Sequence, residues 1–456
     1  MQASPPQVEF AQAVRFWLKL GFIGFGGPAG QIAIMHRELV EQKRWISEQR
    51  FLHALNYCML LPGPEAQQLA TYIGWMLHRT WGGVVAGVLF VLPSLLLLIA
   101  LSSVYVAYGH LAWMSALLYG IKPAVAALVL HAVHRIGSKT LQHPRRAPLL
   151  WAIALASFVA IHAFAVPFPA IVFSALLLGW LGGRYLPGQF SHLGSSHAQL
   201  GGAHGSGAAV IDDGTPLPAH ARFSRPRLLR VLLAGAVLWS LPMLALLLWQ
   251  GWSGTLAAMG WFFTKAALLT FGGAYAVLPY VYQGAVVEHG WLSGTQMMDG
   301  LALGQTLPGP LIMVVAFVGF LGGWSQQVLG PEALFLGAIL AACVVTWFTF
   351  LPSFILILAG GPLVEGTHGK LQFTAPMSAI TAAVVGVIAS LGLFFLTYVA
   401  FPAGAGGAWW QQVDWVALAL ALLALLALVR WQLGVPALIG LSALAGAGLH
   451  AFGWVA

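Results

Sequence analysis

The chain has 456 residues, of which 59% are hydrophobic and only 7% are charged. A soluble chain of this length would carry about a quarter charged residues, so the composition excludes an ordinary soluble globular protein. The formal net charge of +8 does not indicate nucleic-acid binding, because Lys and Arg gather in the segments between apolar runs. We therefore predict an all-α polytopic membrane protein that lies in the lipid bilayer and binds no nucleic acid.

Apolar runs of membrane-spanning length recur from end to end of the chain. The N-terminus lacks the basic-then-apolar form of a cleaved signal peptide, so the first span must direct insertion. We predict thirteen transmembrane helices, over residues 14–33, 52–76, 82–107, 111–136, 148–164, 166–184, 228–250, 258–282, 297–322, 332–358, 374–399, 414–431 and 434–454.

Basic residues in the short loops predict a cytoplasmic N-terminus and a C-terminus outside. Three loops agree, around Arg79, over residues 135–146 and over residues 222–230. One basic loop, residues 37–50, would face outward; it also carries three Glu, and we interpret it as an amphipathic interfacial segment. Trp45 is expected in the interfacial aromatic belt, and so is its counterpart near residue 291.

Two helix-breaking motifs occur twice at one constant offset. Phe-Gly-Gly at residues 25–27 and Pro-Gly-Pro at residues 62–64 return 246 residues later, at 271–273 and 308–310. The chain is thus a tandem duplication, and the odd number of predicted spans between the copies makes it an inverted-topology repeat. The predicted organisation is an N-terminal tail (1–12), a first repeat (13–184), a cytoplasmic linker (185–227), a connecting helix (228–250) and a second repeat (251–456).

The linker is rich in Gly, Ser, His and Pro, which predicts flexible chain. Its histidines are irregularly spaced, so we predict no metal site there. Cys58 and Cys343 lie in apolar segments and are interpreted as small buried residues. The sequence indicates no cofactor.

Gly and Pro inside a span interrupt the helix and free backbone N–H groups at a half-helix N-terminus, which favours an anion. Broken spans in matching positions of two inverted halves are typical of a transport site. The alternative is that these residues only kink their helices, since Gly and Pro are common in transmembrane segments.

Lys19 and Lys265 each lie six residues before a Phe-Gly-Gly motif. A lysine inside a span is costly and is by default functional, although snorkelling to the interface is the alternative. Glu65 follows the first Pro-Gly-Pro motif and either carries a proton or caps the half-helix. His131 and His134 are interpreted as interfacial residues.

The candidate substrate-binding residues are Lys19, Phe25, Gly26, Gly27, Pro28, Pro62, Gly63, Pro64, Glu65, Gln67, Gln68, Lys265, Phe271, Gly272, Gly273, Pro308, Gly309 and Pro310. No catalytic residue is predicted. The chain lacks a phosphate-binding P-loop, a zinc-protease HExxH motif and a nucleophile elbow.

With these motifs in both halves, the sequence resembles the chromate ion transporter family. The resemblance implies a long-chain, two-domain member in a bacterial inner membrane that exports chromate from the cytoplasm and confers chromate resistance. It also implies that sulfate, of the same shape and charge, competes. An exporter of sulfate, sulfite or another small oxyanion is the nearest alternative; a channel and an intramembrane enzyme are more distant ones. A homodimer is compatible with the sequence.

Overall fold

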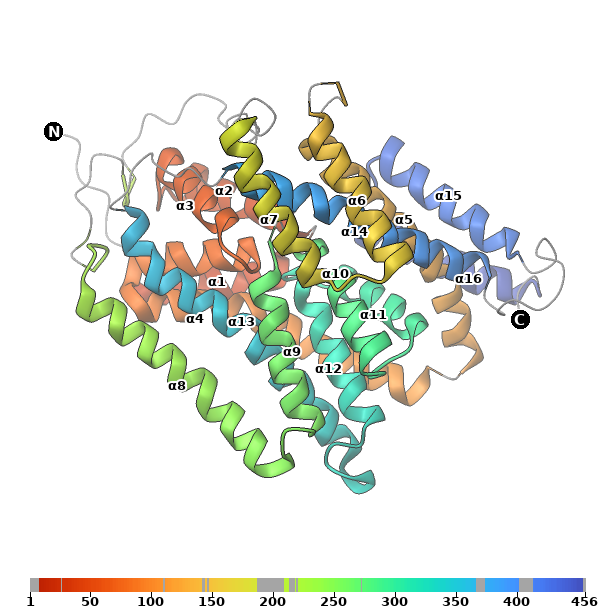
Figure 1. The fold of residues 1–456 in the computed structure, drawn as a ribbon. Coiled ribbons are helices and arrows are strands. Elements are labelled where there is room, and N and C mark those ends of the chain that lie inside the picture. Colours follow the sequence, from red (N-terminus) through yellow and green to blue (C-terminus); the bar gives the residue numbers. More distant parts are fainter. Residues whose placement is uncertain are drawn as a thin grey trace.

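The computed structural model describes residues 8–25, 27–109, 111–141, 144–145, 147–186, 209–212, 218, 220–271, 273–365, 374–401 and 413–453. These residues form sixteen α-helices with short π-helical and 3-10 turns (Figure 1). Within the described ranges, the one strand-like pairing is an isolated parallel bridge between Ile46 and Ile211. The predicted all-α class is therefore confirmed.

The elements follow the predicted spans closely except at the breaks. In the first half they are α1 (Phe10–Ile23), α2 (Gly27–His36), η1 (Arg37–Gln42), α3 (Glu48–Leu60), α4 (Glu65–Tyr108), α5 (Ala112–Thr140), α6 (Pro148–Phe164) and α7 (Phe168–Tyr185). In the second they are α8 (Arg225–Gln250), α9 (Thr255–Leu269), α10 (Ala274–Tyr282), η4 (Gln283–Glu288), α11 (Gly294–Thr306), η5 (Leu311–Met313), α12 (Val314–Ser325), η6 (Pro331–Ala333), α13 (Leu334–Glu365), α14 (Thr374–Ala400), α15 (Trp415–Arg430) and α16 (Val435–Ala451).

Six of these helices are long and apolar enough to cross a membrane: Glu65–Tyr108, Ala112–Thr140, Phe168–Tyr185, Arg225–Gln250, residues 331–362 and residues 375–400. Shorter apolar helices, among them α6, α9, α15 and α16, accompany them. The protein is accordingly a multi-pass membrane protein, as the composition predicts.

All four predicted breaks are present, because the helices stop on each side of residues 24–26, 61–64, 270–273 and 307–310. We call these the first, second, third and fourth breaks. The sequence predicts a chain that continues straight through each break, but the structure shows that it folds back. Phe16 on α1 packs edge-on against Trp45 with ring centroids 5.4 Å apart, and Lys19 Nζ lies 3.5 Å from Glu38 Oε1. α1 and α2 thus form an antiparallel hairpin whose tip is the first break.

The second hairpin consists of α3 and the start of α4. α4 itself turns sharply at His78 and Arg79, and the Arg79 φ of 55° is left-handed. Beyond that bend it runs back along its own first part, and a Cβ on Gly74 would lie 2.5 Å from the Gly82 carbonyl oxygen. Only glycine permits backbones this close. The segment from Glu65 to the bend therefore returns to the side from which α3 came.

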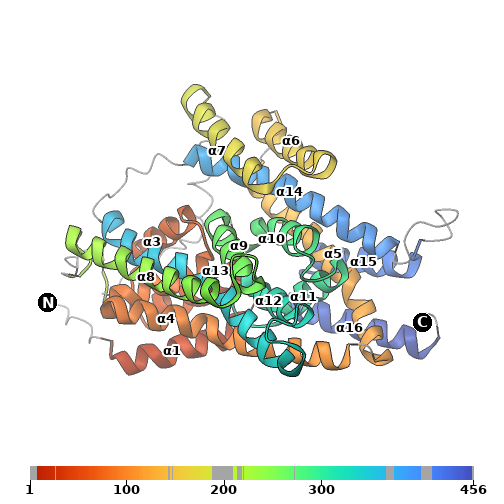
Figure 2. The same ribbon diagram turned by 60° about the horizontal axis from the view of Figure 1, so that its bottom comes forward.

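The second repeat has the same form. Phe262 on α9 stacks on Tyr280 of α10, with ring centroids 4.7 Å apart. Gly300 on α11 lies against the Phe317 ring of α12. The third and fourth breaks are thus the tips of two further hairpins, and Figure 2 shows α9–α12 in the middle of the molecule, between α1–α4 and α14–α16.

The fold-back corrects the expected position of the basic loop at residues 37–50. The Ser47 N–H donates to the Ile211 carbonyl at 2.9 Å, and the Ile211 N–H donates to the Trp45 carbonyl at 3.0 Å. Residues 209–212, which we call the docked linker segment, belong to the predicted cytoplasmic linker. The basic loop therefore lies on the linker side and not opposite it. Trp45 and Trp291 are each only 3% exposed, so they pack inside the protein and not in an interfacial belt.

Candidate functional site

The four breaks are tied in two pairs by backbone hydrogen bonds that cross between the repeats. The Gly63 N–H donates to the Thr270 carbonyl at 2.8 Å, and the Gly309 N–H donates to the Gly24 carbonyl at 2.9 Å. Both donors and both acceptors are related by the same offset of 246 residues. Each Pro-Gly-Pro break is thus tied to the Phe-Gly-Gly break of the other repeat, and the halves interlock where their hairpin tips meet.

The Pro-Gly-Pro sequence suits this contact for two reasons. Proline has no N–H, so the glycine is the one residue of the motif that can donate from its backbone. The φ values of Gly63 and Gly309 are +128° and +112°, a region that side-chain-bearing residues rarely adopt. The motif therefore aims one donor across the interface and ends the helix on each side of it.

Polar side chains complete the junction. The Gln31 amide donates to the Gly24 carbonyl at 2.9 Å and also to the carbonyl of Gly309. The Ser94 hydroxyl donates to the Pro308 carbonyl, so α4 of the first repeat supports the fourth break. Ser353 is its counterpart in the second repeat and lies against Gly63. The Ser353 hydroxyl has no hydrogen-bond partner among the described residues, so the two matching Leu-Pro-Ser sequences both pack against the glycine of the opposite break, but only Ser94 is seen to bond to that break.

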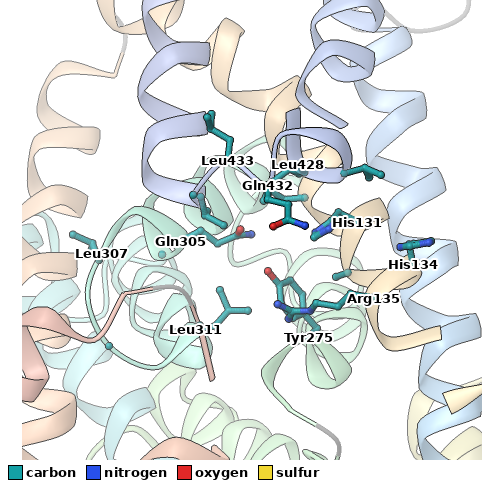
Figure 3. A pocket seen from close by; sticks show the side chains of 18 residues that line it. His131, His134, Arg135, Tyr275, Gln305, Leu307, Leu311, Leu428, Gln432 and Leu433 are labelled. Atoms are coloured by element: carbon teal, nitrogen blue, oxygen red, sulfur yellow. The ribbon is translucent and has the colours of Figure 1, made fainter. Parts of the chain in front are cut away.

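A cavity of about 460 Å³ opens beside this junction (Figure 3). It lies between α5, α10, the end of α11 and the turn that joins α15 to α16. Gly27 and Gly309 bring the first and fourth breaks to its wall. The polar side chains that line it are His131, His134, Arg135, Tyr275, Gln305 and Gln432.

The cavity wall carries positive charge and hydrogen-bond donors. Arg135 lies with its guanidinium carbon 5.9 Å from the centre of the Tyr275 ring. Gln305 is 7% exposed, and neither its amide nitrogen nor its amide oxygen has a partner among the described residues. Figure 3 shows the Gln305 amide and the Tyr275 hydroxyl pointing into the same space as Gln432 and His131. No Asp or Glu is among the described residues that line the cavity.

These features suit a small anion. An arginine and neutral donors that converge on one space can replace part of an anion's hydration shell. A buried amide without a partner is costly unless a ligand or water satisfies it. The absence of a lining carboxylate in the described part of the chain removes the repulsion that an anion would otherwise meet.

The structure brings some of the predicted binding residues to this place. Gly27 and Gly309 line the cavity, and Gly63 lies at the crossed junction beside it. The motif residues Pro62, Pro64, Pro308 and Pro310 flank the glycines at the second and fourth breaks, and Phe25, Pro28, Phe271 and Gly273 flank the first and third. Gly26 and Gly272 lie outside the described residues.

The two predicted lysines lie elsewhere. The Lys19 side chain is 58% exposed and pairs with Glu38 at 3.5 Å. Lys265 is exposed, and its Nζ lies 6.0 Å from the centre of the Trp261 ring. Neither lines the cavity beside the breaks. A role for them in anion binding stays a prediction.

The polar residues after the second break point into the protein. Gln67 and Gln68 are fully buried; their amides donate to the Thr71 hydroxyl at 3.0 Å and to the Pro62 carbonyl at 2.8 Å. Neither side-chain carbonyl oxygen has a partner among the described residues. Glu65 is the first residue of α4, where an acidic side chain suits the helix dipole.

The sequence alone suggests other roles for two cavity residues and does not single out a third. Near a predicted span end, Arg135 has the pattern of a topology determinant and His131 that of an interfacial residue. Gln305 lies two residues before the fourth break, and a polar side chain in an apolar span beside a break is a signal that identifies it. Arg135 and Tyr275 come together only through tertiary folding.

The chain matches the family profile described as "Chromate transporter" over residues 11–180 and 257–447. It is 31% identical over 385 residues to the chromate transport protein of Cupriavidus metallidurans, covering 84% of this chain and 82% of that one. It is 33% identical over 398 residues to the chromate transport protein of Pseudomonas aeruginosa, covering 85% and 81%. A probable chromate transport protein of Synechococcus elongatus is 30% identical over 387 residues, covering 84% of each chain. No solved structure matches the chain significantly.

Proposed function

The chain belongs to the chromate transporter family, and we propose that it is a secondary transporter that exports chromate from the cytoplasm and thereby confers chromate resistance. The observation that carries this proposal is the cavity at the junction of the two repeats, which has Arg135 and Gln305 in its wall and no Asp or Glu among its described lining residues. The names of the relatives in Cupriavidus metallidurans and Pseudomonas aeruginosa supply the substrate.

In this proposal the anion occupies the cavity beside the first and fourth breaks. Arg135 supplies the counter-charge, and the Gln305 amide and the Tyr275 hydroxyl supply donors. Chromate is a tetrahedral dianion, so donors from several directions suit it. Because the site lies between the halves, rocking of one half against the other would expose it alternately to the two sides.

The orientation follows from the basic loops. Folding of α1–α2 and α3–α4 into hairpins puts residues 37–50 on the same side as the docked linker segment. That side also carries the other Arg- and Lys-rich connections, and basic loops face the cytoplasm. We therefore propose a bacterial inner-membrane protein with a cytoplasmic N-terminus and a periplasmic C-terminus, in which each hairpin enters the membrane and returns.

The energetics support export. Moving two negative charges out of a cell at about −150 mV releases about 7 kcal/mol, at about 2.3 kcal/mol per charge per 100 mV. This corresponds to about five decades of concentration. The membrane potential alone would therefore drive export, with or without a proton gradient.

The nearest alternative is an exporter of sulfate, sulfite or another small oxyanion. The donors in the cavity wall suit sulfate as well as chromate. Guanidinium, amide and hydroxyl groups recognise the tetrahedral shape and the double negative charge that the two anions share. Competition between the anions separates the two substrates.

The test is uptake of labelled chromate into inside-out vesicles, with and without a membrane potential and with excess sulfate. We expect saturable uptake that is lost when the gradient collapses. An Arg135→Gln protein that inserts normally should take up far less chromate at low concentration. Wild-type vesicles that contain the inserted protein but take up no chromate would remove chromate as the substrate. Uptake that neither saturates nor depends on a gradient would indicate a channel.

A further inference from the structure

A second polar cluster lies inside the helix bundle, on the helix that also carries Gln305 of the cavity wall. Its centre is Asp299 on α11, which is 3% exposed. The Asp299 Oδ2 atom accepts a hydrogen bond from the Tyr105 hydroxyl of α4 at 2.9 Å. Its Oδ1 atom is buried and has no partner among the described residues.

A lysine on a neighbouring helix acts on Asp299. Lys122 on α5 interacts electrostatically with it, but the two form no ion pair in the described structure. Of the elements packed against α11, α12 carries no titratable side chain and α16 carries His450. Besides Lys122, α5 carries His131, His134, Arg135 and Lys139, and besides Tyr105, α4 carries Glu65, His78 and Arg79. The carboxyl thus has one neutral donor on Oδ2, a cation at longer range, and nothing on Oδ1.

A carboxylate in this place would leave one oxygen bare in a medium of low dielectric constant, which is costly. A proton on Oδ1 removes that charge and leaves Oδ2 bonded to Tyr105. The site therefore supports both the ionised and the protonated carboxyl of Asp299. Lys122 and Tyr105 favour the ionised form, and the unpartnered oxygen favours the protonated form.

The same helix connects this carboxyl to the cavity. Gln305 follows Asp299 by six residues, which is about 9 Å along an α-helix. A dianion beside Gln305 would repel an ionised Asp299 across the protein interior. Binding of the anion would then favour binding of a proton at Asp299, and the proton would favour the anion by the same factor.

The site belongs to one repeat only. At the offset of 246 residues that relates the halves, the counterpart of Asp299 is His53. The carboxyl at this position therefore has no acidic counterpart in the first repeat.

Resting on the proposed function, we propose that Asp299 is a proton-binding site coupled to the anion cavity, so that one proton is bound when the anion enters and released when it leaves. The proton adds to Oδ1 and no other bond changes. In this arrangement the proton and the anion cross together, so one net negative charge moves for each dianion, and the membrane potential supplies half of the energy that it would supply to the dianion alone.

Infrared difference spectroscopy on the full-length protein in lipid tests the proton site without any anion. The wild type should show a protonated-carboxyl stretching band that appears as the pH falls, and Asp299→Asn should lack it. Asp414→Asn is the matched control: Asp414 also accepts from a tyrosine, Tyr119, at 2.7 Å, but its other oxygen accepts from the Ala417 N–H at 2.9 Å. This variant should keep the band.

Titration calorimetry with chromate in buffers of different ionisation enthalpy tests the coupling, at a pH where free chromate is dianionic. We expect proton uptake by the wild type and by Asp414→Asn, and none by Asp299→Asn. As the pH rises across the range in which Asp299 titrates, the wild-type affinity for chromate should fall by up to about tenfold per pH unit. The affinity of Asp299→Asn should stay constant over the same range.

The outcomes separate the two proposals. Wild type that binds chromate without taking up a proton, or Asp299→Asn that takes up as many as wild type, overturns the proton site. Wild type that binds no chromate overturns the substrate assignment, and the infrared band alone then decides whether Asp299 binds a proton. A band that survives in Asp299→Asn overturns the proposal in that case also.

Discussion

Replacing Gly309 by alanine is the sharpest test of the crossed junction. Two separate costs follow from the structure. Its φ of +112° is one that an L-residue adopts only under strain, worth about 1–3 kcal/mol. A Cβ there would also overlap the Ser94 hydroxyl, and overpacking of this kind costs about 1–3 kcal/mol. We expect Gly309→Ala to lose about 2–6 kcal/mol of stability if the two costs add.

Two further glycines make the measurement a graded series. Gly273 has a φ of +98°, but no atom lies within 4 Å of the place that a Cβ would take, so Gly273→Ala should show only the strain. Gly440 lies within α16 and does not have a positive φ, and no atom lies within 4 Å of the place that its Cβ would take. Gly440→Ala should therefore be neutral or slightly stabilising. Ser94→Gly removes the overlap but also the hydrogen bond to the Pro308 carbonyl, so Ser94→Gly alone is the reference for the double variant. Adding Gly309→Ala to Ser94→Gly should cost only the strain.

The assay is the thermal melting of each purified variant in one detergent, together with chromate uptake per inserted molecule. The expected order of melting temperature, from highest to lowest, is Gly440→Ala, Gly273→Ala, Gly309→Ala, and uptake should be lost in the last. If Gly309→Ala has the same melting temperature as Gly440→Ala and transports normally, residue 309 does not need a positive φ and has room for a Cβ. The reasoning about the junction then fails.

Three further outcomes are expected. Arg135→Gln should weaken chromate binding by about tenfold to a hundredfold, since hydrogen bonds to charged groups contribute about 1.5–3 kcal/mol; an unchanged dissociation constant in calorimetry would remove Arg135 from the site. The double variant Lys19→Ala, Lys265→Ala should lose less affinity than Arg135→Gln, because both lysines are exposed outside the cavity; a larger loss would restore the predicted lysine roles. Burial lowers the pKa of His220 from 6.5, against the opposing effect of its hydrogen bond to the Trp75 carbonyl. The stability that neutral His220 gives its own segment, residues 220–224, is present above pH 6.5 and is lost as the pH falls through its lowered pKa. Amide hydrogen exchange in that segment, corrected for intrinsic rates, should therefore accelerate at low pH in the wild type but not in His220→Gln.

Matched controls sharpen two of these tests. Arg184→Gln removes an arginine from the exposed end of α7, outside the cavity lining, and should leave chromate affinity unchanged. Ile211→Pro removes the N–H that donates to the Trp45 carbonyl at 3.0 Å, so it should free the docked linker segment at every pH.

The class of the protein and the location of the breaks could be predicted from the sequence. Long apolar runs exclude a soluble fold. In a bilayer, only a helix gives the backbone groups of an isolated span their hydrogen-bond partners. The Pro-Gly-Pro motif ends a helix wherever it occurs, because proline removes a donor and glycine permits positive φ. The repeat offset of 246 residues further indicates which breaks are equivalent.

The direction of the chain after each break could not be predicted in the same way. A break is compatible with continuing onward or with folding back, and both preserve the order of sides for the rest of the chain. Contacts far apart in sequence choose between them: Phe16 with Trp45, and Gly63 with Thr270. For the same reason Lys19 and Lys265, which share a sequence offset with the motifs, lie on outer surfaces of their hairpins.

Apolar length, Gly and Pro act locally, so the residues alone are enough to establish a helical membrane protein built from two equivalent halves with paired breaks. Which side chains face the junction depends instead on long-range packing. Arg135, Tyr275 and Gln305 come from three different helices, and no local pattern connects them. Asp299 and Tyr105 lie 194 residues apart and meet only because the hairpins of the second repeat pack between the helices of the first.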